Sequence, residues 1–409
     1  MDLQPMAIAP RAPGDYAPAA GARAVETLQA AAEPLAGARV LHVSAAGADG
    51  RVPELLGGSL PLAAGAGLEV HWRVLLGAPE LRATMAALRS GLRGAQSAID
   101  DEEWESFIEA AARVGRGLEG YDAVVLHDSA LGLAAGIEGR AVWHCHDDAS
   151  RAEPEALARA AALTARCAQM LVPHASFAPE GLAGSTVTAV APGIDPLGPR
   201  NIELEPRLPG RVLRPLGIDL ERPFCLQVLA VDGFDDPQPV IEALRLAHAE
   251  EPDLQLVLAA LLETADSAGW QAAKEISDDA SNGAGVLLVT TYQGLGSREL
   301  GALQLLARAV LGRSRAEAFD LAPCEALWKR TPVIGPPEGG LPLIVRDGVE
   351  GYLSAGVEES ARRMVELVRD PGLAAEMGRA GRERVRERFL VTAALERELV
   401  ALAGTVQAA

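Results

Sequence analysis

The chain has 409 residues, 49% of them hydrophobic, so it is long enough for about two or three domains with large cores and is not mainly disordered. Its 37 basic and 56 acidic side chains give a net charge of −19, which argues against general affinity for nucleic acid or for an anionic membrane. No apolar run reaches the roughly 18–20 residues that a membrane-spanning helix needs.

The beginning of the chain carries no basic start followed by an apolar core, so we expect no signal peptide and a cytoplasmic protein. Residues 1–18 are rich in alanine and proline, and we predict a loose arm there. The four cysteines form no CxxC pair, which favours a reducing compartment over a disulfide framework or a zinc site.

Short apolar runs alternate with alanine-rich stretches of helical spacing through the first half of the chain. The predicted strands are 39–44, 68–74, 123–127, 141–145, 170–173 and 187–191, and the predicted helices include 53–62 and 154–168. Strands that alternate with helices are typical of a parallel sheet covered on both faces.

The stretch 195–223 contains six prolines and interrupts this alternation, which predicts a linker in which any hinge motion resides. A second alternation follows. Its predicted strands are 224–231, 254–260, 286–290, 308–311 and 332–335, and its predicted helices are 240–250, 325–329, 358–369, 373–389 and 392–402.

The two alternations predict two doubly wound α/β domains, with any ligand bound in a cleft between them at the carboxyl ends of the strands. The expected boundaries are 19–206 for the N-terminal domain and 207–385 for the C-terminal domain. Residues 386–409 are expected to form a C-terminal helix that returns to the N-terminal domain.

Four segments in chain order carry a resemblance to a known family. They are Trp-His-Cys-His-Asp-Asp-Ala-Ser at 143–150, Pro-Gly-Ile-Asp-Pro-Leu at 192–197, a Glu-x7-Glu pair at 317–325, and a buried run at 332–335 followed by Gly-Gly-Leu-Pro at 339–342. This order resembles the retaining family 4 glycosyltransferases of GT-B fold, and more narrowly the trehalose-forming glycosyltransferring synthases. The resemblance covers nearly the whole chain.

The resemblance implies that glucose is transferred from a nucleotide-activated glucose to a sugar acceptor. It implies two Rossmann-like domains facing a central cleft, an N-terminal acceptor-side domain and a C-terminal nucleotide-sugar-side domain. It also implies no cofactor, no metal and a homodimer, while the net charge predicts no nucleic-acid or membrane partner.

The Glu-x7-Glu pair places Glu317 in a loop and Glu325 on the first turn of a helix that starts near Pro323. Carboxylates there suit hydrogen bonds from sugar hydroxyls. The resemblance implies that Glu317 holds the donor sugar as a catalytic residue and that Glu325 binds the nucleotide ribose. The alternative is a solvated pair that caps a helix.

Gly339 and Gly340 with Leu341 follow the predicted strand 332–335 and are candidates for donor binding. Successive glycines permit close backbone approach, and their amides can cradle a phosphate or a sugar hydroxyl. An ordinary tight turn is the alternative.

His146 and Asp148 come at the end of the strand 141–145, and His127 and Asp128 come at the end of the strand 123–127. The resemblance implies that His146 is a catalytic residue that reaches the donor sugar, and that the other three bind the acceptor. A histidine satisfied within the core is the alternative for His146. Asp147 stands where the family usually has an apolar residue.

Several departures from the family concern the donor diphosphate, whose growing negative charge must meet cationic side chains. By the resemblance, Ala230 and Asp235 stand where an Arg and a Lys belong, and Asp320 replaces a glycine. Losing two such contacts costs on the order of 2–5 kcal/mol each.

In the phosphate-side loop of the first domain only Gly50 of a glycine triplet remains, followed by Arg51, which could restore positive charge. Arg313, Arg315 and Arg346 are other basic residues that could reach the diphosphate. The alternative hypothesis is a weakened or inactive pseudo-glycosyltransferase that acts as a sugar-binding, scaffold or regulatory partner.

Overall fold

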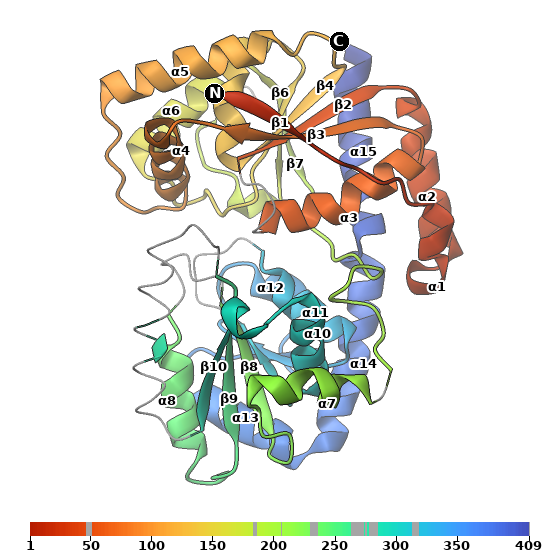
Figure 1. Cartoon of the computed structure of the whole chain (residues 1–409), viewed down its shortest axis with the longest axis vertical. Coiled ribbons are helices and arrows are strands. Elements are labelled where there is room, and N and C mark those ends of the chain that lie inside the picture. Colours follow the sequence, from red (N-terminus) through yellow and green to blue (C-terminus); the bar gives the residue numbers. More distant parts are fainter. Residues whose placement is uncertain are drawn as a thin grey trace. The chain divides into compact units, whose positions relative to one another are not determined.

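The computed structural model describes residues 1–45, 51–182, 186–205, 207–229, 236–262, 274, 276–277, 285–312 and 319–408 (Figure 1). The chain forms two compact units. Unit 1 consists of Met1–Gly193 together with Leu390–Ala409, and unit 2 consists of Ile194–Phe389.

The sheet of unit 1 has the strand order β1-β3-β2-β4-β5-β6-β7. The strands are β1 (Asp2–Met6), β2 (Arg39–Ser44), β3 (Glu69–Leu76), β4 (Ala123–His127), β5 (Ala141–His144), β6 (Cys167–Val172) and β7 (Thr186–Ala189). All neighbouring pairs are parallel except β1 with β3. The six strands predicted for this half are confirmed, although the helix predicted over 154–168 ends at Thr164 because Cys167 already pairs with β5.

Helices cover both faces of this sheet. They are α1 (Ala17–Ala20), α2 (Ala22–Ala32), α3 (Arg51–Gly65), α4 (Pro79–Leu92), α5 (Asp101–Arg116), α6 (Pro154–Thr164) and α15 (Val391–Ala408), with 3-10 turns that include η1 (Pro13–Tyr16) and η3 (Asp128–Gly136). Helix α5 starts where it does because the Asp100 carboxylate accepts hydrogen bonds from the amides of Glu102 and Glu103. Its Phe107 is fully buried in the same apolar cluster as Leu126 and Trp143.

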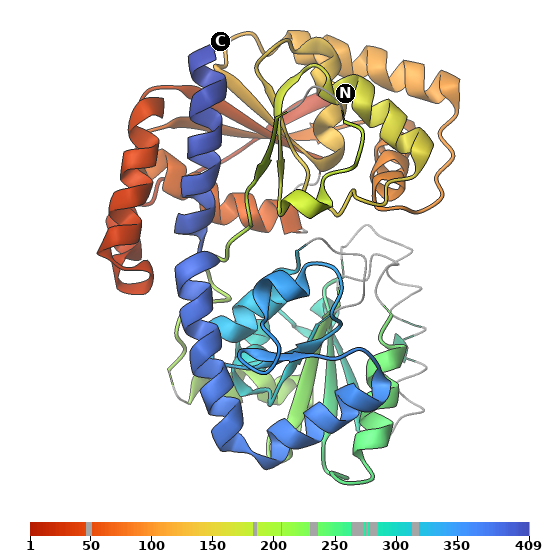
Figure 2. The ribbon, with the colours of Figure 1, turned by 180° about the vertical axis from the view of Figure 1, so that it is seen from behind.

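The opposite face of the sheet is covered by α15, the darkest blue helix, which ends at the C label in Figure 2; it packs beside α2 and contacts β4 and β6. Gln169 of β6 donates to the carbonyl of Ala401 at 2.7 Å and to Thr405 Oγ1 at 2.8 Å. The predicted return of the C-terminal helix to the first domain is therefore confirmed.

Residues 1–18 are not a loose arm. Residues 2–6 form the edge strand β1, which pairs antiparallel with β3 (Figure 1). The amide of Arg11 donates to the carbonyl of Pro61 in α3 at 2.9 Å, and Tyr16 is fully buried. Composition misled the prediction because all of these contacts join segments that are distant in sequence.

The sheet of unit 2 is entirely parallel, with the order β10-β9-β8-β11-β12-β13. The strands are β8 (Phe224–Leu229), β9 (Gln255–Ala260), β10 (Val286–Thr290), β11 (Val310–Leu311), β12 (Val333–Gly335) and β13 (Gly351–Leu353). The helices are α7 (Leu208–Leu213), α8 (Gln238–Ala247), α10 (Ser297–Leu306), α11 (Leu321–Trp328), α12 (Leu341–Ile344), α13 (Val357–Arg369) and α14 (Pro371–Arg388). Five of these strands were predicted, and the short β13 was not.

The stretch predicted to be a linker belongs to unit 2. Helix α7 packs against α10, and the carbonyl of Asn201 accepts a hydrogen bond from Trp328 Nε1 at 3.1 Å. The prolines of the stretch 195–223 are compatible with this packed, irregular path as well as with a linker. Among the described helices, none combines the length and the apolar character that a membrane crossing requires.

Candidate functional site

Four histidines are buried in the sheet of unit 1 or directly after one of its strands. His42 lies on β2, His127 ends β4, His144 ends β5, and His146 follows two residues later. All four are at most 6% exposed, and His127 and His144 are neighbours across the β4–β5 pair. Parallel strands bring their carboxyl ends to one edge, so residues far apart in sequence meet there.

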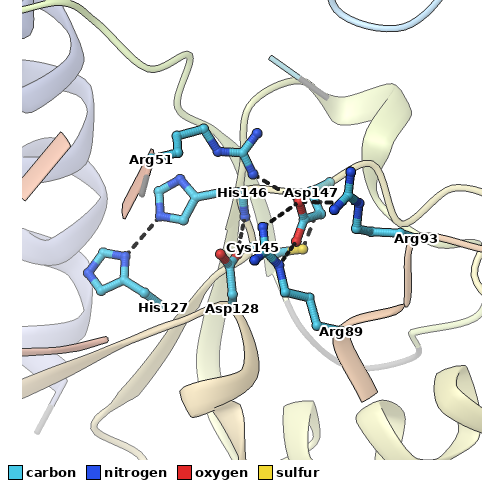
Figure 3. A network of polar contacts seen from close by, with 8 residues as sticks. All are labelled: Arg51, Arg89, Arg93, His127, Asp128, Cys145, His146 and Asp147. Carbon is cyan, nitrogen blue, oxygen red and sulfur yellow. Dashed lines mark hydrogen bonds and ion pairs between the residues drawn. The ribbon is translucent and has the colours of Figure 1, made fainter. Parts of the chain in front are cut away.

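Three of these imidazoles form a hydrogen-bonded row. His42 Nδ1 lies 3.1 Å from His127 Nε2, and His127 Nδ1 lies 2.9 Å from His146 Nε2 (Figure 3 shows the second pair). Burial lowers the pKa of His42 to about 4 and holds the pKa values of His127 and His146 well below their ordinary range. The three rings are therefore neutral near pH 7.

The carboxylate of Glu398 on α15 lies beside this row. Its Oε1 is 3.6 Å from Nδ1 of His144, and both side chains are buried. Burial by itself raises the pKa of the Glu398 carboxyl, but the contact with His144 outweighs burial and lowers it. Glu398 is thus a buried negative charge at the α15 side of the histidines.

Asp147 is the centre of a second polar network, in which three guanidinium groups surround one carboxylate (Figure 3). Arg51 of α3 lies 2.9 Å from Asp147 Oδ1, Arg89 of α4 lies 2.8 Å from Oδ2, and Arg93 lies 3.9 Å from Oδ1. Burial alone would raise the pKa of Asp147, but Arg89 and Arg51 outweigh it and hold the pKa below its ordinary range. The only sequence signal for this network was a charged residue where the family has an apolar one.

Asp128 ties the end of β4 to the loop that carries His146. Its Oδ1 accepts the backbone amide of His146 at 2.8 Å, and its carbonyl accepts from Trp143 Nε1 at 3.0 Å. Its φ of 48° lies in the left-handed region, which costs on the order of 1–3 kcal/mol for a residue other than glycine. Burial and the charge of Asp147 raise the pKa of Asp128.

Unit 1 therefore brings four of the residues singled out in the sequence, His127, Asp128, His146 and Arg51, into two adjoining networks. Arg51 was expected near the donor phosphates, and in the structure it binds Asp147. Asp148 instead organises its own turn, because its Oδ1 accepts from the amide and the hydroxyl of Ser150 at 3.0 and 2.6 Å.

In unit 2, Glu325 lies in the second turn of α11 rather than the first, because the helix begins at Leu321 and not near Pro323. The helix starts earlier because Asp320 is its N-cap and accepts from the amide of Ala322 at 3.0 Å. A capping role for Asp320 is thus a structural reason for an aspartate in place of the expected glycine.

The Glu325 side chain is 1% exposed, so it is not part of a solvated pair. Its Oε1 accepts from Arg200 at 3.2 Å and its Oε2 from Gln304 at 2.8 Å. Since a carboxylate offers about four lone-pair positions, these two bonds leave acceptor capacity for a ribose hydroxyl.

The segment Gly339-Gly340-Leu341 forms a turn that leads into α12. Gly339 has φ of 64°, in the left-handed region that favours glycine, and Gly340 is the N-cap of α12. Leu341 is buried against Gly312, which follows β11, and against Gly335, which ends β12. A Cβ added at Gly335 would lie 2.5 Å from Leu341 Cδ2, and a Cβ added at Gly312 would lie 3.0 Å from it. The turn is therefore held in place by its leucine.

Other residues singled out in the sequence have fixed partners or lie outside the described residues. Arg346 binds the buried Glu350 through both its amide and its guanidinium group. The described ranges do not include Gly50, Ala230, Asp235, Arg313, Arg315 and Glu317, so their predicted roles stay predictions.

Residues 42–179 match the trehalose synthase N-terminal domain, and residues 213–384 match the glycosyl transferases group 1. The trehalose synthase of Rubrobacter xylanophilus is 33% identical over 91% of this chain and 92% of its own length.

Two solved structures share the fold. The α,α-trehalose 6-phosphate synthase of Burkholderia multivorans aligns with a TM-score of 0.69 at 15% identity, over 91% of this chain and 99% of that one. Anabaena HepE in complex with UDP-glucose aligns with a TM-score of 0.60 at 15% identity, over 91% and 100%. The two parallel-sheet units and the near full-length likeness lead to one conclusion: the chain belongs to the trehalose synthase family of GT-B glycosyltransferases.

Proposed function

We propose that this protein transfers glucose from a nucleoside diphosphate glucose to a sugar acceptor with retention of configuration, as a trehalose synthase-like enzyme. The observation that carries the proposal is the 33% identity to a trehalose synthase across 91% of the chain. Both halves of the fold are included, because the two family matches lie one in each unit.

The proposal assigns the donor nucleotide to unit 2. Glu325 binds the ribose with the lone pairs that Arg200 and Gln304 leave open, and the backbone of Gly339, Gly340 and Leu341 binds the donor. Glu317 holds the donor sugar. A buried, already oriented carboxylate such as Glu325 suits this task because it needs no reordering when the ligand arrives.

The proposal assigns the acceptor sugar to unit 1, at the carboxyl ends of β4 and β5. Asp128 and Asp148 bind the acceptor there, and His146 contacts the donor sugar. His127, expected from the sequence to bind the acceptor, has both ring nitrogens on other histidines and supports His146 instead. The loop that carries His146 is well suited to precise placement, since Asp128 holds its backbone and the guanidinium groups around Asp147 hold the next residue.

The reaction breaks the bond between the anomeric carbon and the diphosphate oxygen, whose electron pair leaves with the nucleoside diphosphate. The acceptor oxygen forms a new bond to that carbon on the same face, and its proton passes to the departing diphosphate. Ala230 and Asp235 supply no cation for this leaving group, so we expect a slower reaction than the family pattern would give. The comparisons give no support to the inactive alternative.

The test incubates the purified full-length chain with UDP-, ADP- or GDP-glucose and with glucose or glucose 6-phosphate, and measures nucleoside diphosphate and disaccharide. Diphosphate release that requires an acceptor supports the proposal. His146→Asn should reduce the rate about 10²-fold or more if His146 stabilises the transition state. His174→Gln, an exposed histidine of unit 1, is the matched control.

A thermal-shift series with the same nucleotides gives an independent result. At about 100 times Kd, a bound donor adds about 2.7 kcal/mol of stability. No shift with any nucleotide, together with no diphosphate release, would rule the enzyme out in favour of a pseudo-glycosyltransferase. Double replacement of Ala230 by Arg and Asp235 by Lys should raise the rate if these positions limit it.

The sequence also led us to expect a cytoplasmic homodimer that needs no metal, and these expectations belong to the proposal. Light scattering coupled to size-exclusion chromatography measures the oligomeric state directly. Activity after dialysis against EDTA tests the metal requirement.

A further inference from the structure

The histidine row of unit 1 consists of three rings that are nearly parallel. The rings of His42 and His127 are 22° apart, and those of His127 and His146 are 13° apart. Both links join nitrogen to nitrogen, at 3.1 and 2.9 Å, which are hydrogen-bond distances. Each link therefore needs one proton, carried by one of its two nitrogens.

A metal ion is a competing explanation, because His127, His144 and His146 bring ligand nitrogens within 4.8 Å of one another. An imidazole binds a metal in the plane of its ring. The rings of His144 and His146 are stacked, 24° apart with centroids at 4.1 Å, so an ion in the plane of one ring lies out of the plane of the other. The ring geometry thus favours hydrogen bonds over coordination.

Counting protons leaves only two arrangements for three neutral rings with two links. Either every ring carries its proton on Nδ1, or every ring carries it on Nε2, because a ring that accepts at one nitrogen carries its proton at the other. In the first arrangement Nδ1 of His146 is a donor, and in the second it is an acceptor. No described residue forms a hydrogen bond with Nδ1 of His146. The arrangement of protons therefore decides whether a ligand meets a donor or an acceptor at this atom.

Charges at the two ends of the row favour the same arrangement. Although burial has the largest effect on His42 and lowers its pKa, the Glu398 carboxylate acts to raise it, more strongly than His144 acts to lower it, and so attracts protons toward that end. At the other end burial again lowers the pKa of His146 most, followed by His144 and His127, and the guanidinium groups of Arg51 and Arg89 lower it further. Protons are drawn toward His42 and repelled from the outer side of His146.

We propose that His42 and His127 are positioning residues that hold His146 in its Nε2-protonated form, with an unprotonated Nδ1 that accepts a hydrogen bond. Glu398 at one end and the Arg51–Arg89 pair at the other polarise this row. The inference rests on the proposed function in one respect only, which is that the group meeting Nδ1 is a sugar hydroxyl acting as donor. A protonated Nδ1 would instead select a carbonyl or phosphate oxygen.

The experiment is a two-bond ¹H–¹⁵N correlation spectrum of the full-length chain labelled with ¹⁵N-histidine near pH 7.5, recorded without substrate. The expected spectrum shows His146 with its proton on Nε2. The Glu398→Gln variant keeps the side-chain shape and removes the charge. It should shift the tautomer ratio of His146 toward Nδ1 by about tenfold, the order of effect that a nearby charge has in a buried environment. His127→Phe breaks both links and should leave His146 as a mixture.

His174→Gln is the control, because His174 is exposed and its ring bonds to Ser176 in its own turn, and it should leave the His146 signals unchanged. Three results would overturn the inference: a proton on Nδ1 of His146 in the unaltered chain, no response to Glu398→Gln, or one equivalent of tightly bound metal by elemental analysis. Since these spectra need no turnover, an inactive enzyme and a wrong tautomer are distinguishable. Adding UDP-glucose should move the Nδ1 resonance of His146, and no movement would remove the sugar hydroxyl as its ligand.

Discussion

The two units share one architecture, yet they bury ionisable groups in different ways. In unit 2, the two buried carboxylates among the described residues, Glu325 and Glu350, are each paired with one arginine. In unit 1, six of the seven histidines of the chain are found, four of them buried, and a single carboxylate, Asp147, is shared by three arginines.

This difference indicates where the molecule holds groups in an unusual protonation state. Paired charges in unit 2 serve mainly to place a carboxylate. In unit 1, burial lowers the pKa values of His42, His127 and His146, and the guanidinium groups keep the buried Asp147 ionised. Strongly shifted pKa values concentrate at functional sites in proteins. We therefore expect chemical discrimination mainly from unit 1 and ligand placement mainly from unit 2.

The largest expected effect concerns Asp147 of unit 1 and the three arginines around it. Asp147→Asn removes the charge of a buried carboxylate that Arg51, Arg89 and Arg93 share, so we expect a loss of about 3–5 kcal/mol of unfolding free energy. Glu325→Gln in unit 2 affects one arginine and keeps an acceptor oxygen, so about 1–3 kcal/mol is expected. Differential scanning calorimetry of the full chain measures both, and equal losses would contradict the contrast.

Lowering the pH should reduce the folding stability of unit 1 before that of unit 2. The folded-state pKa of His42 is about 4 against an ordinary value of 6.5, so the unfolded chain binds a proton that the folded chain does not. The stability from this histidine is fully present above pH 6.5 and is lost as pH falls toward 4, by about 3 kcal/mol.

His127 and His146 act in the same direction, because burial also lowers their pKa values, whereas the raised pKa of Asp128 offsets part of the loss at the acid end. Melting curves between pH 8 and 4 measure the effect, with His42→Phe as the variant that should flatten it. A profile that is unchanged in that variant would show that the row does not control acid stability.

A steric change in unit 2 should give a smaller loss of unfolding free energy. Gly335→Ala places a Cβ 2.5 Å from Leu341 Cδ2 and 3.1 Å from the Cα of Gly312, which costs about 1–3 kcal/mol because the site is already filled. Gly57→Ala, at an exposed position in α3 with nothing within 4 Å, should instead stabilise by about 0.5–1 kcal/mol. If Leu341 takes part in donor binding, only Gly335→Ala should also weaken the nucleotide-induced thermal shift.

Removal of divalent metal should have the smallest effect. We expect no change in diphosphate release or in melting after EDTA treatment, since hydrogen bonds explain the histidine row without an ion. A loss of activity that Zn²⁺ or Mg²⁺ restores would contradict both the metal-free reaction and the interpretation of the row.

The strand pattern was readable because buried parallel strands are short apolar runs between turns, and ten of the eleven predicted strands matched or needed only changes at their ends. The remaining one, 308–311, is reduced to the two residues of β11. Residues 2–6 were missed because this edge strand contains Asp2 and Pro5 and lacks an apolar run.

Motifs identified individual site residues, but not their partners. His127, Asp128, His146 and Glu325 were selected from their places in the sequence, whereas Glu398, Arg89 and Gln304 were not, since nothing near them in sequence marks a contact across the fold.

By itself, the sequence determined the α/β alternation, the family, and the residue types gathered at the strand ends, because apolar runs, turn residues and motifs are local properties. The tertiary structure alone decided which charges meet. Asp147 lies between guanidinium groups from 58 and 96 positions away, and His42 meets a ring 85 positions later. Protonation in a buried environment depends on desolvation and on neighbours in space, and neither is written in the order of the residues.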